Sequence, residues 1–369
     1  MKNKIKLLKN VYLKKNKPVS LVLFLTNRCN ARCSFCFIDF DNKISQNKKN
    51  ELTTNDYKEI SINLKDSLVH LNITGGEPFL RSDIDQIVLN FIKNSGISSI
   101  VFSTNGSYPK RIKEFVQNVC MKNPNVEFIF QFSIDSYPDE HDKIRKIPGL
   151  SEKTFESYNI VKNSSKNCIA TCNLTVSEQN YFKIVEIYNF LTKEKNIETI
   201  NPIIVRNEGV FSIKDNLKNK LLLAYKDLTS LITKEIKQKK LRGFSNFSLT
   251  GEILNAKNEI SFDMVQKSYL KPKFYTQCVA GSIFGVMQSN GDVYPCEILK
   301  EPLGNIKDYN LDFMSLWNNK KSNETRKWIK DTKCNCHWEC IYTYNLISSP
   351  KYSSKIAATV LTNKLKSLT

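Results

Sequence analysis

Three cysteines near the N-terminus carry the clearest chemical signal in this 369-residue chain. Cys29, Cys33 and Cys36 lie within eight residues, in the order C-N-A-R-C-S-F-C. Three thiolates can hold three irons of an iron–sulfur cube, whereas ordinary cluster proteins supply all four ligands from cysteine. The spacing therefore predicts a cluster with one iron open to a ligand other than protein. A structural zinc with a distant fourth ligand is the alternative.

A glycine-rich turn further along predicts a second part of the same site. Gly75, Gly76, Glu77 and Pro78 come just after the apolar run Val69–Ile73. Paired glycines let a backbone approach a ligand closely, and the proline holds the preceding acid rigidly. We expect this turn to suit an ammonium group.

Five more cysteines gather near the C-terminus, at Cys278, Cys296, Cys334, Cys336 and Cys340. A hairpin that turns near Asn290-Gly291 would bring the first two together. Five thiolates complete one four-cysteine cluster with one left over, so a single auxiliary [4Fe–4S] cluster is predicted. Zinc is the alternative, and His337 could replace one ligand.

The remaining cysteines, Cys120, Cys168 and Cys172, fit no ligand spacing, and we expect them to pack as small hydrophobic side chains.

Alternating strands and helices must position these groups. Residues rich in β-branched and aromatic types predict strands at Leu21–Leu25, Val69–Ile73, Ser99–Phe102, Val126–Ile134, Cys168–Val176 and Thr199–Val205. Helical periodicity predicts helices at Thr54–Lys65, Asp83–Lys93, Pro109–Met121, Ser151–Lys162 and Glu178–Lys193. Repeated βα units imply a parallel sheet covered by helices. Ligands bind at the carboxyl ends of such strands, where the first cysteines and the glycine turn both lie.

The two motifs together resemble the radical S-adenosylmethionine superfamily, in which Phe35 before Cys36 also fits the pattern. The resemblance implies an α/β fold, a partial (β/α)6 TIM-like barrel with a small C-terminal cysteine-rich auxiliary-cluster domain. It also implies a [4Fe–4S] cluster on Cys29, Cys33 and Cys36, whose fourth iron binds S-adenosylmethionine. The segment from Gly75 to Pro78 would contact the methionine amino group.

Other strand ends resemble segments that line the same cofactor. The resemblance assigns cofactor contacts to Ser103 and Asn105 after the third strand and to Ser133 and Asp135 after the fourth. Ser133 and Asp135 point to the same face of a strand, although Asp135 could instead cap the following turn. Arg145 resembles an arginine that binds the cofactor carboxylate.

The C-terminal cysteines resemble the auxiliary-cluster domains called SPASM or twitch. Cys278-x12-Gly-x4-Cys296 matches their opening motif, but the later cysteines are fewer than in SPASM. The departure favours one auxiliary cluster bound by Cys278, Cys296, Cys340 and one of Cys334 or Cys336. No residue pattern identifies a catalytic side chain beyond these ligands.

The resemblance implies an enzyme that cleaves S-adenosylmethionine reductively to a 5′-deoxyadenosyl radical and abstracts hydrogen from a substrate. An external donor such as flavodoxin or ferredoxin would supply the electron. A small, anionic or sugar-like metabolite is favoured over a peptide, because only 28 residues precede Cys29 and leave no room for a leader-binding domain. The alternatives are a maturase of a ribosomal peptide or protein and a non-catalytic iron–sulfur protein that binds nucleic acid or scaffolds partners.

Composition limits the partners further. The net charge of +19 tolerates an anionic substrate, but the lysines are scattered, so nucleic-acid binding is not expected. No apolar stretch is long enough to span a membrane or serve as a signal peptide, and eleven cysteines without a disulfide pattern indicate a reducing cytoplasm.

The expected organisation is an N-terminal extension at 1–15, the barrel at 16–211, a helical connector at 212–273, the auxiliary-cluster domain at 274–345 and a helical tail at 346–369. Within the connector, 242–273 shows few periodic features.

Overall fold

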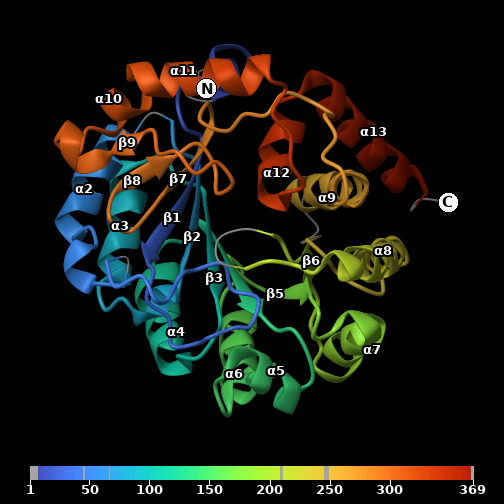
Figure 1. The fold of residues 1–369 in the computed structure, drawn as a ribbon. Coiled ribbons are helices and arrows are strands. Elements are labelled where there is room, and N and C mark those ends of the chain that lie inside the picture. The colour runs from blue at the N-terminus through green and yellow to red at the C-terminus, as the bar shows by residue number, and fades with distance from the viewer. Residues whose placement is uncertain (1–6, 45, 66, 208–210, 245–248, 367–369) are drawn as a thin grey trace.

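The computed structural model describes residues 7–44, 46–65, 67–207, 211–244 and 249–366. Within them, one nine-stranded sheet runs in the order β6-β5-β4-β3-β2-β1-β7-β8-β9. The first six strands alternate with helices and are all parallel, as the sequence predicts. Figure 1 shows these helices wrapped around the outside of the curved sheet. The arrangement is a partial (β/α)6 barrel.

The barrel elements agree closely with the periodic segments of the sequence. The strands are β1 Ser20–Thr26, β2 His70–Gly75, β3 Ser99–Thr104, β4 Glu127–Ser133, β5 Cys168–Val176 and β6 Ile200–Ile204. The helices are α2 Thr54–Asn63, α3 Ile84–Asn94, α4 Pro109–Phe115, α5 Pro138–Arg145, α6 Leu150–Lys162 and α7 Ile184–Asn189. π-helical turns extend α4 through Val116–Cys120 and α7 through Phe190–Glu194. Only α5 lay outside the predicted helices.

The C-terminal part of the chain adds to the same sheet. β7 Phe284–Met287 pairs in parallel with β1, and β8 Asp292–Tyr294 returns antiparallel to β7, which confirms the hairpin near Gly291. β9 Gly304–Asn305 follows at the edge. The remaining helices are α8 Asp215–Lys237, α9 Leu249–Ser268, α10 Phe313–Trp317, α11 Lys320–Asp331, α12 Glu339–Ile347 and α13 Pro350–Lys366. The segment at 242–273 therefore contains a 20-residue helix that its weak periodicity concealed.

Strand alternation divides the core into two parts. Leu21, Leu23 and Leu25 of β1 face the outer helices in the main hydrophobic cluster, which also holds Cys120, Cys168 and Cys172. Val22 and Phe24 face the opposite side and pack with the C-terminal segment. The two faces of one strand thus join the barrel wall to the cysteine-rich region, because side chains alternate along a strand.

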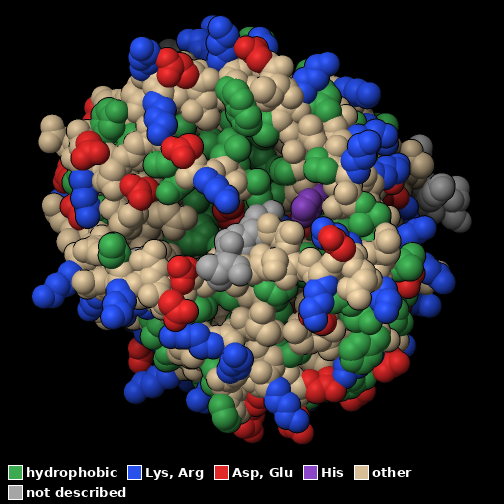
Figure 2. All heavy atoms as spheres, viewed as in Figure 1, with side chains coloured by type: hydrophobic (Ala, Val, Ile, Leu, Met, Phe, Trp, Pro, Cys, Tyr) green, Lys and Arg blue, Asp and Glu red, His purple; other side chains and the backbone are tan. Residues whose placement is uncertain are grey.

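Basic side chains are scattered over the face of the molecule that Figure 2 shows. Figure 2 shows Lys and Arg spread over the whole visible face, interspersed with Asp and Glu. Among the described helices, none is long and apolar enough to cross a bilayer.

Candidate active site and auxiliary metal centre

The N-terminal cysteine loop follows β1 and rests on the end of α5. Backbone N–H groups of Arg32 and Ser34 donate to the carbonyls of Arg145 and Ile144, at 3.1 and 3.4 Å. The Cys36 N–H donates to the Cys33 carbonyl at 3.2 Å. The loop is therefore held at the carboxyl end of the sheet, where the sequence places it.

The three thiols of this loop lie near one another. Cys29, Cys33 and Cys36 are all partly buried. Burial raises the pKa of Cys29 to about 12, and the charges of Glu77 and of the other two cysteines raise it further. A bound cation would reverse this effect, because positive charge favours thiolate. Three partly buried thiols in one loop suit a metal cluster.

The cluster prediction and the zinc alternative need different ligand geometries. Across the described residues, no three Cys, His, Asp or Glu side chains converge closely enough to hold one metal ion. A zinc ion draws four ligands to about 2.3 Å from one centre, whereas each thiolate of an iron–sulfur cube binds a different iron.

A buried arginine faces the cysteine loop. The Nη1 of Arg145 lies 3.5 Å from the Sγ of Cys33. Its Nε and Nη2 donate to Oδ2 of Asp135 at 2.8 and 2.6 Å. The other Asp135 oxygen accepts the Thr175 N–H at 3.3 Å, so this carboxylate does not merely cap a turn. Asp135 holds the guanidinium in place between β4 and the cluster loop.

The glycine turn packs directly against the backbone of the cysteine loop. The Gly76 N–H donates to the Thr26 carbonyl at 2.7 Å, and the Glu77 N–H donates to the Arg28 carbonyl at 3.0 Å. Gly75 has a φ of +126°, and a Cβ there would lie 2.1 Å from the Thr26 oxygen. A Cβ on Gly76 would lie 2.1 Å from the Arg28 oxygen. Both positions require glycine because the two backbones touch.

The Glu77 side chain turns into the fold. Its Oε1 accepts from the Thr104 hydroxyl at 2.8 Å and the Phe79 N–H at 3.1 Å, and Oε2 accepts the Asn105 N–H at 2.8 Å. Burial nevertheless raises the pKa of Glu77 to about 7. The sequence suggested a carboxylate open to an ammonium group, but both oxygens join the end of β2 to the end of β3.

The other predicted cofactor contacts lie on the same edge. The Asn105 Nδ2 donates to Asn30 Oδ1 at 2.9 Å and lies 3.9 Å from the Cys29 sulfur. Ser103 and Ser133 are partly buried at the ends of β3 and β4. Pro78 is buried and begins a short 3₁₀ turn. The structure therefore brings all the predicted residues of the first site to one end of the barrel.

A row of amides on the concave face escaped the sequence analysis. Asn201 Nδ2 donates to Asn173 Oδ1 at 3.0 Å, and Asn173 Nδ2 lies 3.5 Å from Gln131 Oε1, which also contacts the Ser103 hydroxyl at 3.5 Å. These side chains occupy the inward alternate positions of β3 to β6. Polar residues at alternate positions of otherwise apolar strands were the available signal. The row gives the barrel a hydrogen-bonding interior.

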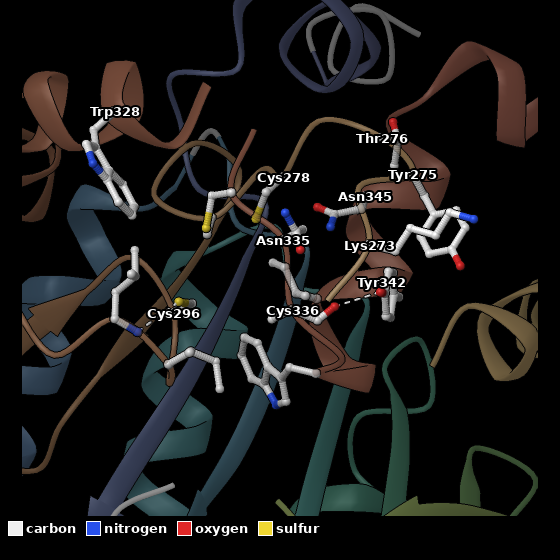
Figure 3. A pocket seen from close by; sticks show the side chains of 16 residues that line it. Lys273, Tyr275, Thr276, Cys278, Cys296, Trp328, Asn335, Cys336, Tyr342 and Asn345 are labelled. Carbon is white, nitrogen blue, oxygen red and sulfur yellow. Dashed lines mark hydrogen bonds between the residues drawn. The ribbon is translucent and has the colours of Figure 1, made fainter. Parts of the chain in front are cut away.

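Four of the C-terminal cysteines share one cavity of about 250 Å³. They are Cys278, Cys296, Cys334 and Cys336, and Figure 3 shows three of them, labelled, around the space together with Trp328 and Tyr342. Burial raises the pKa of Cys336 to about 12 and that of Cys296 to about 11. The hairpin does bring Cys278 and Cys296 to the same place.

Cys340 lies apart from this group. It does not line the cavity, and its electrostatic neighbours are Glu297, Arg206, Glu339 and Lys257 rather than the other thiols. The sequence favoured Cys340 with only one of the Cys334 and Cys336 pair, but the structure groups that pair with the first two cysteines. The reason is that α12 begins at residue 339. Cys340 therefore lies in the first turn of this helix, while Cys334 and Cys336 lie on the irregular segment that precedes it.

The histidine between these cysteines packs away from the cavity. The ring of His337 lies edge-on to Tyr269, with centroids 5.1 Å apart, and is absent from the cavity lining. The packed-turn interpretation of His337 therefore fits better than a role as ligand.

Comparison with protein families matches both regions. Residues 23–191 match the radical SAM superfamily, and residues 278–341 match SPASM, an iron–sulfur cluster-binding domain. The GTP 3′,8-cyclase of Aquifex aeolicus is 31% identical over 115 residues, which cover 31% of this chain and 36% of that enzyme. That of Thermodesulfovibrio yellowstonii is 29% identical over 150 residues, 39% of this chain and 43% of the enzyme. The chain thus matches less than half of the length of these relatives.

Solved structures are similar over more of the chain. SuiB of Streptococcus suis, bound to the precursor peptide SuiA, has a TM-score of 0.58 at 19% identity. The match covers 88% of this chain and 70% of the SuiB chain. The structure of anSMEcpe with bound AdoMet and the Kp18Cys peptide has a TM-score of 0.60 at 17% identity. That match covers 94% of this chain and 99% of the anSMEcpe chain. At these identities the likeness supports the fold.

Proposed function

The chain belongs to the radical S-adenosylmethionine superfamily and carries a SPASM domain, and from this we propose that Cys29, Cys33 and Cys36 bind the cluster at which S-adenosylmethionine is cleaved. The protein is an enzyme whose cofactors are [4Fe–4S] clusters and S-adenosylmethionine. The observation that carries the residue assignment is the shared position of three partly buried thiols, the Gly75–Gly76 backbone and the Arg145 guanidinium at one strand edge.

The chemistry belongs to the cofactors, and the protein supplies geometry. Held by Cys29, Cys33 and Cys36, the cluster together with S-adenosylmethionine would supply radical chemistry, in which reductive cleavage of the cofactor leads to abstraction of hydrogen from the substrate. Arg145 places a positive charge beside Cys33, where its guanidinium would face the bound cluster. The Gly75–Gly76 backbone packs against the cysteine loop because these positions carry no Cβ, and there it would contact the methionine part of the cofactor.

The strand-end residues complete the cofactor pocket. We assign further cofactor contacts to Ser103, Asn105 and Ser133, which lie at the same edge. Asp135 is a positioning residue, since its carboxylate is occupied by Arg145. The amide row lies deeper in the barrel and would receive hydrogen-bonding groups of the substrate.

Cys278, Cys296, Cys334 and Cys336 bind the auxiliary cluster in this proposal. Their shared cavity supports the choice of these four ligands. Four protein ligands leave no iron open to substrate. The auxiliary cluster would therefore accept the electron left on the oxidised substrate or pass electrons outward, with a flavodoxin or ferredoxin as the external donor.

The substrate class is the finer part of the proposal. The sequence favoured a small molecule, but SuiB and anSMEcpe were each solved with a peptide, so the comparisons do not support that preference. The partial likeness to GTP 3′,8-cyclases favours a small-molecule substrate instead. Peptide maturation is the second candidate, and the two are separated by assaying turnover of each kind of compound.

The test is anaerobic reconstitution with iron, sulfide, S-adenosylmethionine and dithionite. We expect 5′-deoxyadenosine and about eight irons per chain, as two cubes require. The Cys29→Ala/Cys33→Ala/Cys36→Ala variant should form no 5′-deoxyadenosine yet keep about four irons, which is the internal control for its folding. Product formation by this triple variant would refute the assignment, and a protein without cleavage in any form would support the non-catalytic alternative.

A further inference from the structure

A helix of the C-terminal region closes the open side of the partial barrel. At its start, the Glu339 Oε1 of α12 accepts the Ile204 N–H of β6 at 3.1 Å. Further along, the Tyr344 hydroxyl accepts from the Ser20 hydroxyl of β1 at 2.7 Å. Figure 1 shows α12 and the neighbouring α9 beside the gap between these two strands. The inner wall of the barrel is thus completed by helix side chains.

One of these side chains is a buried lysine. Lys257 of α9 is only 8% exposed, and its Nζ donates to the Thr343 hydroxyl of α12 at 3.1 Å. Among the described residues, no carboxylate lies within ion-pair distance of this ammonium, and Cys340 is the one group whose charge raises its pKa. The ammonium therefore has a neutral hydroxyl as its partner.

This arrangement is costly without a further ligand. Moving an ammonium out of water costs several kcal/mol unless an opposite charge compensates it. Burial accordingly lowers the pKa of Lys257 to about 8. The nearby Arg206 shows the usual solution, since its Nη2 pairs with Glu297 at 3.0 Å. Lys257 differs from it in having no such partner.

The lysine also packs against a helix face that carries an exposed cysteine. Cys340 lies three residues before Thr343 on α12, so the two share a face of the helix. Cys340 is exposed. The hydrogen bond to Thr343 therefore places the Lys257 ammonium at this face of α12.

We propose that Lys257 and Thr343 form a binding site for an anionic group of the substrate, a carboxylate or a phosphate. The ammonium supplies the charge, and the Thr343 hydroxyl supplies a second donor. The assignment of this anion to the substrate rests on the proposed radical function, whereas the anion site itself does not. The amide row of β3 to β6 would bind the uncharged part of the same molecule.

The test measures anion binding by the full-length reconstituted protein without turnover. Sodium phosphate and, separately, sodium acetate are titrated at constant ionic strength set by chloride, and the thermal midpoint is followed. We expect a saturable rise in the midpoint with at least one anion, and an apparent affinity at least ~10-fold weaker in Lys257→Met, the loss of one charged hydrogen bond. The anion that binds more tightly, phosphate or acetate, shows whether the anionic group of the substrate is a phosphate or a carboxylate.

A second readout separates an anion site from a purely structural lysine. Removing an uncompensated buried charge should raise the midpoint of the ligand-free protein by roughly 2 °C, whereas losing a structural contact would lower it. Lys220→Met removes the same charge from an exposed position and should change neither quantity. Lys257→Arg should keep most of the anion response.

Two results would overturn the proposal: an unchanged anion response in Lys257→Met, or a lower ligand-free midpoint in that variant. The same titration in the triple cysteine variant of the first site separates this proposal from the proposed function. An intact anion response beside absent 5′-deoxyadenosine formation in the wild type would refute the radical function alone.

Discussion

Replacement of Asp135 by asparagine tests whether Arg145 is held by a buried ion pair. The Asp135 carboxylate is fully buried and receives both Nε and Nη2 of Arg145 on one oxygen, at 2.8 and 2.6 Å. Burial opposes the charge of the guanidinium, but Asp135 raises the pKa of Arg145 above its ordinary value. An amide keeps the shape of the side chain and removes the compensating charge. We expect Asp135→Asn to lower the free energy of unfolding by about 3–5 kcal/mol, the usual cost of a single buried charge left without its partner.

Urea unfolding of the cofactor-free protein, followed by far-UV circular dichroism, measures this loss. The matched control is Asp85→Asn, because Asp85 pairs with Arg111 at 2.7 Å but both side chains are about a quarter exposed, at 25% and 24%. An exposed pair of this kind contributes at most about 1 kcal/mol. The contrast between the two variants isolates the effect of burial from that of the Asp-to-Asn change.

The double variant Asp135→Asn/Arg145→Gln provides the deciding comparison. Since it removes both charges, it should be more stable than Asp135→Asn alone, which a double-mutant cycle reports as a coupling of at least ~1 kcal/mol. The reasoning is refuted if Asp135→Asn costs no more than Asp85→Asn, or if the two changes are additive. Asp135→Asn should also bind less iron at the first site, because Arg145 would no longer be fixed beside Cys33.

Three further predictions concern the same two sites. Gly76→Ala should destabilise the protein by at least ~2 kcal/mol in urea unfolding, since its Cβ would meet a backbone oxygen at 2.1 Å, whereas Gly96→Ala, whose nearest contact is 3.8 Å, should be close to neutral. The raised pKa of Glu77 means that the folded protein keeps a proton that the unfolded chain loses near pH 4.5, so stability of the cofactor-free protein should fall by up to about 3 kcal/mol as the pH rises from about 4.5 to 7. Glu77→Gln should flatten this dependence, and an unchanged slope would contradict the assignment. Cys334→Ser should lose about four of the eight irons after reconstitution while Cys340→Ser keeps them, and the reverse pattern would restore Cys340 as a ligand.

The barrel was predictable because its strands and helices carry strong periodic signals. All six strands lie where runs of β-branched and aromatic residues stand, within a few residues at each end. Helix α5 was missed because Pro138–Arg145 is short and polar, and its buried residues include His141 and Arg145 rather than an apolar stripe. Helix α9 lies within the helical connector expected at 212–273, but its bounds were not predicted, because the polar residues Lys257 and Ser261 are buried among its apolar ones and weaken the periodic signal.

The candidate ligands were predictable as a set, but their grouping was not. Cysteine spacing predicted all eight thiols as candidate ligands, since spacing is local information. The choice among Cys334, Cys336 and Cys340 depended on where α12 begins, which sets the direction of each side chain. The inward turn of Glu77 likewise depended on Thr104 and Asn105, which reach it from the next strand.

The amino-acid sequence by itself predicted the resemblance to the radical S-adenosylmethionine superfamily, the cofactors that this resemblance implies and the edge of the sheet at which the candidate first site lies, because motif spacing and strand periodicity are properties of short segments. Only the tertiary structure decided which four thiols share a cavity, that Asp135 compensates Arg145, and that no carboxylate of the described residues lies beside Lys257. Each of these depends on contacts between residues that are distant in the chain, and the burial that gives them their energetic weight exists only after the elements pack.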